Sequence, residues 1–142
     1  MSEKVLLVDD EQEFVETLAE RMRARDMVVS TATSPIDAID KANKESYDAI
    51  VLDLQMPEMD GLEVLKLLKE KNPDLQIILL TGHATVEKGI QAMKFGAMDL
   101  VEKPADIKIL TEKIKEAQAK KMILVEKNAE EKIKKLIQTK GW

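Results

Sequence analysis

Residues 47–61 read YDAIVLDLQMPEMDG, and this stretch decides the fold. It opens with an apolar run from Ala49 to Leu52, reaches the carboxylate of Asp53, and breaks into a loop that contains proline and glycine. A short apolar run bounded by turn residues predicts a strand that is buried on both faces. Asp53 would then lie at the carboxyl edge of a sheet, where open α/β sheets place their sites. By itself, Asp53 is either a cap for the next helix or a chemically active group.

Strand-like and helix-like runs alternate along the rest of the chain. Phe14, Leu18 and Met22 lie on one helical face, and Ser34-Pro35 is typical of a helix start. We expect strands at residues 4–8, 27–31, 49–53, 75–80 and 97–102, and helices at 11–25, 34–44, 60–71, 85–94 and from about 106 onward. This (βα)5 pattern predicts an α/β fold, a doubly wound, five-stranded parallel sheet covered on both faces.

Composition and charge limit the function classes. The chain has 142 residues and no cysteine, which suits one globular core and excludes disulfides and thiolate metal sites. Residues 1–4 lead directly into a short apolar strand, so we expect a cytoplasmic protein without a signal peptide or a membrane partner. Residues 1–118 hold 15 Lys/Arg and 24 Asp/Glu, a formal charge of −9, which argues against direct binding of nucleic acid.

The last helix continues beyond the compact domain. Its first part carries one apolar stripe, and a second stripe follows Lys120-Lys121, at Met122, Val125, Ala129, Ile133 and Leu136. A helix continuous from Asp106 to Gln138 would be about 50 Å long. We therefore expect a domain at residues 1–118 and a C-terminal helical extension or linker at 119–142. Because the apolar side chains of the second stripe would otherwise be exposed to water, we expect the stripe to pair with another copy or with an output protein.

Several polar side chains follow the predicted strands and should meet at one edge of the sheet. They are Asp9 and Asp10 after the first strand, Asp53 after the third, Thr81 after the fourth and Lys103 after the fifth. Carboxylates this close repel each other, and a hard cation such as Mg²⁺ relieves the repulsion. Asp53 could then act as a nucleophile on a phosphoryl group, with Lys103 and Thr81 stabilising the charge of that group. Each residue alone could equally be a cap, a turn or a solvated lysine; their convergence favours a site.

The motifs together resemble the receiver domain of the response regulators of bacterial two-component systems, which include chemotaxis regulators. The resemblance covers residues 3 to about 118 and rests on residues 8–11 (VDDE), 53–61 (DLQMPEMDG), 81–83 (TGH), 96–97 (GA) and 103–104 (KP). It implies a flavodoxin-like fold with strand order 2-1-3-4-5. It also implies a signalling phosphoprotein that catalyses only its own phosphorylation and dephosphorylation, and is not otherwise an enzyme.

The resemblance implies a role for each residue of the site. Asp53 would take a phosphoryl group from the phosphohistidine of a sensor histidine kinase. Asp10 and Asp53 would bind Mg²⁺ directly, with Asp9 nearby or acting through water and the main-chain carbonyl of Gln55 as a further ligand. Lys103 would pair with the acyl phosphate and Thr81 would move to donate a hydrogen bond to it. The peptide before Pro104 would be cis.

Two further positions, Leu100 and His83, bear on how closely the chain follows the receiver family. Receivers usually carry Tyr or Phe three residues before the lysine, and this chain carries Leu100. Leucine has no ring and no polar tip, which predicts a muted rotamer switch or signalling carried mainly by backbone shifts. His83 would flank the site, and we interpret it as a loop histidine without chemistry. The switch would act on partner binding, through an output domain or a homodimer formed by the last strand and its neighbouring helices or by the C-terminal helix.

Three other classes remain as alternatives. A haloacid-dehalogenase-like phosphohydrolase also uses an aspartate and Mg²⁺, but it carries an Asp-x-Asp pair after its first strand. A flavin or nucleotide binder needs a phosphate-binding loop there, whereas residues 9–11 read DDE and would repel an anion. An interaction module that works without phosphorylation would not need the complete acidic set.

Overall fold

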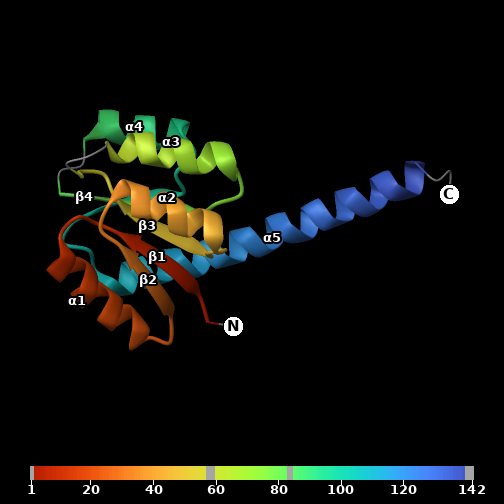
Figure 1. Cartoon of the computed structure of the whole chain (residues 1–142). Helices are drawn as coiled ribbons and strands as arrows, with labels where there is room; N and C mark the ends of the chain where they lie inside the picture. Colours follow the sequence, from red (N-terminus) through yellow and green to blue (C-terminus); the bar gives the residue numbers. More distant parts are fainter. Residues whose placement is uncertain (1, 57–59, 83–84, 140–142) are drawn as a thin grey trace.

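The computed structural model of the chain describes residues 2–56, 60–82 and 85–139, so the expectations for Pro57, Glu58, Met59 and His83 fall outside the described residues. Strands and helices alternate as expected (Figure 1). The elements are β1 (Lys4–Val8), α1 (Gln12–Arg23), β2 (Val28–Ala32), α2 (Pro35–Lys44), β3 (Ala49–Asp53), α3 (Gly61–Lys71), β4 (Ile77–Thr81), α4 (Val86–Lys94), β5 (Asp99–Glu102) and α5 (Ile107–Thr139).

The five strands form one parallel sheet in the order β2-β1-β3-β4-β5, which confirms the predicted topology. Successive side chains of a strand point to opposite faces, and the core divides accordingly. Leu6, Ile50 and Ile77 pack under α2, α3 and α4, whereas Leu7, Val51 and Ile78 pack under α1 and α5. All strands end at the same edge, so the residues that follow them are brought together there.

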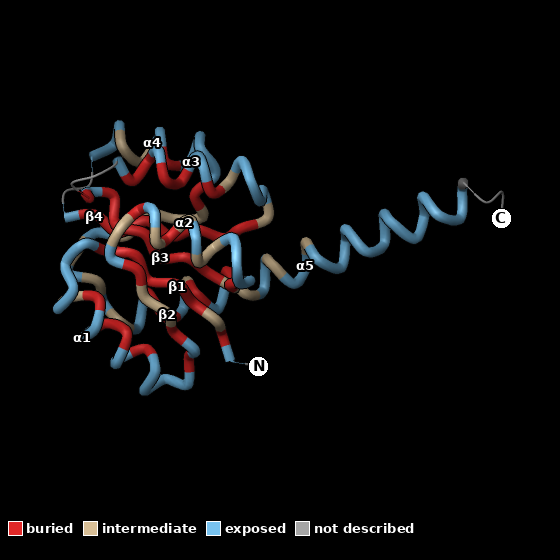
Figure 2. Tube along the Cα trace, viewed as in Figure 1, coloured by how far each residue is buried: buried red, intermediate tan, exposed pale blue. Residues whose placement is uncertain are grey.

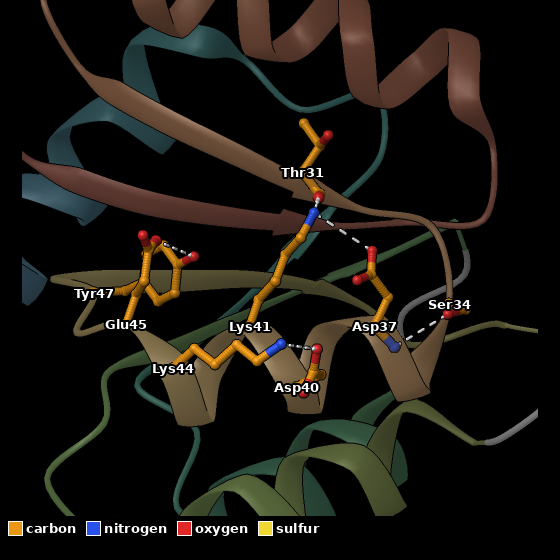
Figure 3. Close-up of polar contacts among 8 residues, drawn as sticks. All are labelled: Thr31, Ser34, Asp37, Asp40, Lys41, Lys44, Glu45 and Tyr47. Atoms are coloured by element: carbon orange, nitrogen blue, oxygen red, sulfur yellow. Dashed lines mark hydrogen bonds and ion pairs between the residues drawn. The ribbon is translucent and has the colours of Figure 1, made fainter.

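The free edge of β2 is protected by cations from both flanking helices. The guanidinium of Arg23 on α1 donates to the carbonyl of Val29 at 2.8 Å. The ammonium of Lys41 on α2 donates to the carbonyl of Thr31 and lies 3.4 Å from Asp37 (Figure 3). Charged groups that occupy the carbonyls of an edge strand oppose pairing with another strand. Ser34 caps α2 as predicted, since its hydroxyl accepts the N–H of Asp37.

The expected element bounds differ from the observed ones where local turns intervene. α1 ends at Arg23, two residues early, because Asp26 adopts a left-handed φ of 64° and turns the chain toward β2. β4 starts at Ile77, because the carbonyls of Pro73 and Leu75 accept hydrogen bonds from Lys69. β5 starts at Asp99, because Ala97 still closes the end of α4 through its N–H.

α5 is one continuous helix, as expected, and it leaves the domain at the edge opposite the carboxyl ends of the strands (Figure 1). Leu110, Ile114 and Ala117 are fully buried against the sheet. The second apolar stripe is exposed, and every residue from 129 to 138 is exposed (Figure 2). Among the described residues, no helix has both the length and the apolar character that spanning a membrane requires.

Two side chains of α5, Lys121 and Asn128, hold the start of the extension against the domain. The ammonium of Lys121 donates to the hydroxyl of Ser46 at 2.8 Å and to the carbonyl of Tyr47 at 3.0 Å. The amide of Asn128 donates to the carboxylate of Asp74 at 2.9 Å. The part of α5 up to about residue 128 is therefore fixed relative to the sheet, and the remainder extends beyond it.

Candidate functional site

Asp9 and Asp10 stand directly after β1. The N–H of Asp9 donates to the carbonyl of Ala32 on β2, and its Oδ1 accepts the N–H of Glu11 at 3.0 Å. These bonds leave Asp9 buried at the sheet edge, while Asp10 is exposed beside it. The pair therefore offers one fixed, buried carboxylate and one carboxylate that faces solvent.

Asp53 is the last residue of β3 and does not cap the next helix. Its Oδ1 accepts the N–H of Gln55 at 3.2 Å, and the residue is 3% exposed. The cap of α3 is Asp60, whose Oδ1 accepts the N–H of Leu62. A β-carbon on Gly61 would lie 2.4 Å from Cα of Leu54, so only glycine lets α3 start this close to the end of β3. The alternative of a structural cap is thus removed, and Asp53 is free for chemistry.

Lys103 connects the end of its own strand, β5, to the ends of three other strands, β4, β3 and β1. It follows β5, its N–H donates to the carbonyl of Thr81 at the end of β4, and its peptide bond with Pro104 is cis, as expected. Its ammonium donates to Oδ2 of Asp9 at 2.8 Å and lies 3.6 Å from Oδ2 of Asp53. One cation therefore contacts two of the three carboxylates.

Burial and charge shift the ionisation of this group of residues. Burial raises the pKa of Asp53 to about 6; the N–H of Gln55 opposes the rise, the charge of Asp9 adds to it and Lys103 lowers it. Burial alone would lower the pKa of Lys103, but its hydrogen bond with Asp9 and the negative charges of Asp53 and Asp9 outweigh burial and raise the pKa above the usual lysine value. At neutral pH the site thus holds an ionised but poorly solvated carboxylate beside a firmly protonated amine.

The three carboxylates form a set of hard oxygen donors. Asp9, Asp10 and Asp53 each offer an oxygen, and these atoms lie within 4.8 Å of one another. Three negative charges against the single ammonium of Lys103 leave an excess that a divalent cation would balance, and oxygen donors suit Mg²⁺. The donor set therefore fits the predicted ion.

The remaining predicted residues lie beside this cluster. Gln55 is exposed next to Asp53 and lines, with Asp10 and Met56, a cavity of about 550 Å³ that reaches Lys88 on α4. Thr81 is fully buried at the end of β4. The structure thus brings every predicted site residue to the same sheet edge.

One contact in the site was not anticipated from the sequence. The ammonium of Lys103 lies 4.5 Å from the centroid of the Phe14 ring. The sequence pattern placed Phe14 only on the buried face of α1. Its position one helical turn after Asp10 was the available signal, since that turn must face the residues at the sheet edge.

Leu100 occupies the position where an aromatic switch residue was expected. It is half-buried on β5 and packs against the core under α4. A β-carbon built on Gly89 of α4 would lie 3.8 Å from Cδ2 of Leu100. Leu100 is therefore enclosed on the side of α4, at ordinary contact distance.

Comparisons with known proteins agree with this geometry. The chain is 38% identical over 109 residues to the photosynthetic apparatus regulatory protein RegA of Cereibacter sphaeroides, covering 75% of this chain and 58% of RegA. It is 32% identical over 115 residues to the transcriptional regulatory protein ZraR of Klebsiella oxytoca, covering 81% of this chain and 26% of ZraR. The chain thus spans less than two thirds of the length of these relatives.

A solved structure has a similar fold. The response regulator protein TrrA of Thermotoga maritima, in complex with Mg(2+)-BeF, superposes with a TM-score of 0.74 at 32% identity, covering 82% of this chain and 99% of that one. Residues 5–115 match the family described as the response regulator receiver domain. With its acidic edge, its lysine after β5 and this match over most of its length, the chain belongs to the response regulator receiver domain family of two-component systems.

Proposed function

We propose that Asp53 accepts a phosphoryl group from the phosphohistidine of a sensor histidine kinase. A carboxylate oxygen of Asp53 forms a bond to phosphorus while the N–P bond breaks, and the electron pair of that bond leaves with the imidazole nitrogen. The observation that carries this proposal is the meeting of Asp9, Asp10 and Asp53 within 4.8 Å, with Lys103 in contact with two of them. Beyond this reaction and the hydrolysis of the acyl phosphate to Asp53 and inorganic phosphate, we assign the chain no catalytic activity.

Mg²⁺ is the ion that this site would hold. Asp10 and Asp53 would bind it directly, with the main-chain carbonyl of Gln55, and Asp9 would stand nearby or act through water. This division is supported by the bonds of Asp9, both of whose oxygens already accept hydrogen bonds, from Glu11 and Lys103. When bound, the ion would neutralise charge on the incoming phosphoryl oxygens.

Lys103 and Thr81 would stabilise the product. The ammonium of Lys103 would shift from the carboxylates toward a phosphoryl oxygen, and the hydroxyl of Thr81 would donate to another. The two residues already lie next to each other at the sheet edge, since the N–H of Lys103 donates to the carbonyl of Thr81. The acyl phosphate would bring about 1.5 to 2 negative charges into an acidic site, and these two donors would compensate for them.

The signal would leave the site through the surface made by α4, β5 and the start of α5, which we call the α4–β5–α5 face. This face already exposes large apolar side chains, including Val86 at 83% and Ile90 at 53%. Exposed apolar surface of this kind favours an output domain or a second copy as partner. No direct partner among nucleic acids or membranes is proposed for the acidic body, and we place the exchange with the kinase in the cytoplasm.

We propose residues 1–118 as the receiver domain and residues 119–142 as a C-terminal extension or linker, helical up to Thr139. The exposed stripe at Met122, Val125, Ile133 and Leu136 supports a second dimer contact along α5. Sedimentation of the full chain, with and without phosphodonor, tests this part. Association that is lost in the double variant Ile133→Lys/Leu136→Lys supports it, and a monomer at all concentrations rejects it.

The phosphoacceptor assignment is tested with a small phosphodonor and Mg²⁺, followed by intact mass and peptide mapping. Wild type should gain one phosphate on the peptide that carries Asp53, and Asp53→Asn should gain none. Glu63→Gln, which changes an exposed carboxylate in the first turn of α3, is the matched control and should gain one phosphate. Phosphate on another residue would refute the assignment, and steady turnover of small phosphate esters would indicate a phosphohydrolase instead.

A further inference from the structure

The side chain of Phe14 contacts the ammonium of Lys103 as well as the apolar core. Phe14 lies on α1, half-buried, one turn after the acidic pair. The ammonium of Lys103 lies 4.5 Å from the centroid of its ring, and the same ammonium lies 2.8 Å from Asp9 and 3.6 Å from Asp53. The cation therefore has an aromatic ring as its third neighbour, besides two carboxylates.

Lys103 needs such a neighbour because of its place in the sheet. It follows β5 at one edge of the sheet, and its side chain must pass β4 to reach Asp53 after β3 and Asp9 after β1. A lysine side chain has many rotamers, and its ammonium is strongly hydrated. Here the side chain is only 18% exposed, so little water remains to solvate it. The negative face of an aromatic ring attracts a cation that has lost water, whereas an aliphatic side chain does not.

We propose that Phe14 is a positioning residue for phosphotransfer, whose ring holds the ammonium of Lys103 against Asp9 and Asp53. This inference rests on the roles proposed above for Asp53 and Lys103. Phe14 acts through Lys103 and makes no contact with the phosphoryl group itself. The competing explanation is packing, since Phe14 also lies against the core under α1 and α5 and lines a hollow with Ala105.

Four substitutions separate the ring face from the packing. Phe14→Leu and Phe14→Met keep an apolar side chain and remove the ring, whereas Phe14→Tyr and Phe14→Trp keep the ring. Leu18→Ala is the packing control: Leu18 is buried on α1 and lines the same hollow as Phe14, so its truncation removes apolar packing beside Phe14 but keeps the ring. The rate of phosphorylation by a small phosphodonor at saturating Mg²⁺ is measured for each variant, with circular dichroism to verify folding.

We expect Phe14→Leu and Phe14→Met to be phosphorylated about 3- to 10-fold more slowly than wild type, in line with the strength of a partly dehydrated cation–π contact. Phe14→Tyr should restore the rate to within about twofold, and Leu18→Ala should be within the same range. A second readout needs no phosphorylation. The ε protons of Lys103, identified by their loss in Lys103→Met, should be shifted upfield by the ring in wild type and Phe14→Tyr, and not in Phe14→Leu.

Each outcome of these experiments either supports or overturns the positioning role of Phe14. Wild-type rates in Phe14→Leu and Phe14→Met, an equal slowing in Leu18→Ala, or ε protons without an upfield shift would overturn the positioning role while leaving Asp53 as phosphoacceptor. A wild-type protein that takes no phosphate would overturn the proposed function first, and the positioning role with it. The proposal is supported if Phe14→Leu and Phe14→Met are phosphorylated slowly while Phe14→Tyr is phosphorylated at nearly the wild-type rate. It also requires that the upfield shift of the Lys103 ε protons depends on the ring.

Discussion

Lys103, after β5, donates a 2.8 Å hydrogen bond to Asp9, which lies 94 residues earlier, after β1. The same ammonium stands 3.6 Å from Asp53, so its stronger contact is with the carboxylate that we do not assign as phosphoacceptor. The lysine is therefore held at the site before any phosphate arrives, and its charge partly offsets the charges that would attract Mg²⁺.

Removing the positive charge of Lys103 should have opposite effects on Mg²⁺ binding and on phosphorylation. In Lys103→Met, Mg²⁺ should bind about 3- to 10-fold more tightly, because the carboxylates lose a competing cation. Phosphorylation should slow by roughly 10- to 100-fold, because the phosphoryl charge loses a stabilising partner. Calorimetric titration and intact mass measure the two effects. Lys94→Met, which removes an exposed lysine of α4, is the control and should change neither. Weaker Mg²⁺ binding in Lys103→Met would contradict this account.

The raised pKa of Asp53 makes stability depend on pH. Because the folded-state pKa of about 6 exceeds the ordinary value of 3.8, the folded protein holds a proton that the unfolded chain releases between these pH values. The free energy of unfolding contributed by Asp53 is therefore highest below pH 3.8 and falls as the pH rises through 6. In EDTA at pH 7.5, Asp53→Asn should be more stable than wild type by roughly 1 to 3 kcal/mol.

Urea unfolding at several pH values tests this dependence. The advantage of Asp53→Asn should shrink as the pH falls from 7 toward 4, because the wild-type carboxyl becomes neutral as well. Glu63→Gln, an exposed carboxylate, is the control. A stability difference that stays constant over this range would show that Asp53 ionises normally in the folded protein.

Leu100 should respond little to phosphorylation. Its side chain has no polar tip that could bond to Thr81, and it lies close to α4 beside Gly89. We expect its methyl carbons, observed by NMR before and after phosphorylation, to keep one rotamer while backbone signals of α4 and β5 shift. A discrete rotamer change of Leu100 would contradict the expectation of a muted switch.

Gly61 and Gly89 form a matched pair, since both lie within helices but meet different neighbours. A β-carbon on Gly61 would lie 2.4 Å from the backbone of Leu54, whereas one on Gly89 would meet only Cδ2 of Leu100 at 3.8 Å. Gly61→Ala should therefore lower the free energy of unfolding by roughly 2 kcal/mol or more, as overpacking does. Gly89→Ala should raise it by up to about 1 kcal/mol, because alanine favours the helix. Equal effects of the two substitutions would refute the difference in packing.

The sequence was sufficient to predict the sheet and the place of the site. Apolar runs of strand length ending in Asp9, Asp53, Thr81 and Lys103 locate those residues at one edge, because parallel strands with helical crossovers all end on the same side. The same patterns located Ser34 as a cap and α5 as one continuous helix, as the structure has them.

The sequence did not predict contacts that depend on how long side chains cross between elements. Phe14 matched the buried face of α1; its position one turn after Asp10 placed it near the sheet edge, but did not indicate that its ring would meet Lys103. The hydrogen bonds of Lys121 and Asn128 to the domain could not be predicted either, because they also depend on the path of a side chain between two elements. The early end of α1 depended on a left-handed Asp26, a conformation that sequence patterns assign first to glycine.

The bond from Lys121 to Tyr47 ties the linker to the segment that leads into β3, the strand that ends in Asp53. A displacement of β3 along its own axis would therefore move α5 directly through this bond, and would not depend on α4 or β5. From Asn128, which bonds to Asp74, to Thr139 the helix extends about 16 Å. A tilt of about 10° at Asn128 would swing the tip by about 3 Å, enough to bring two helical stripes into or out of register.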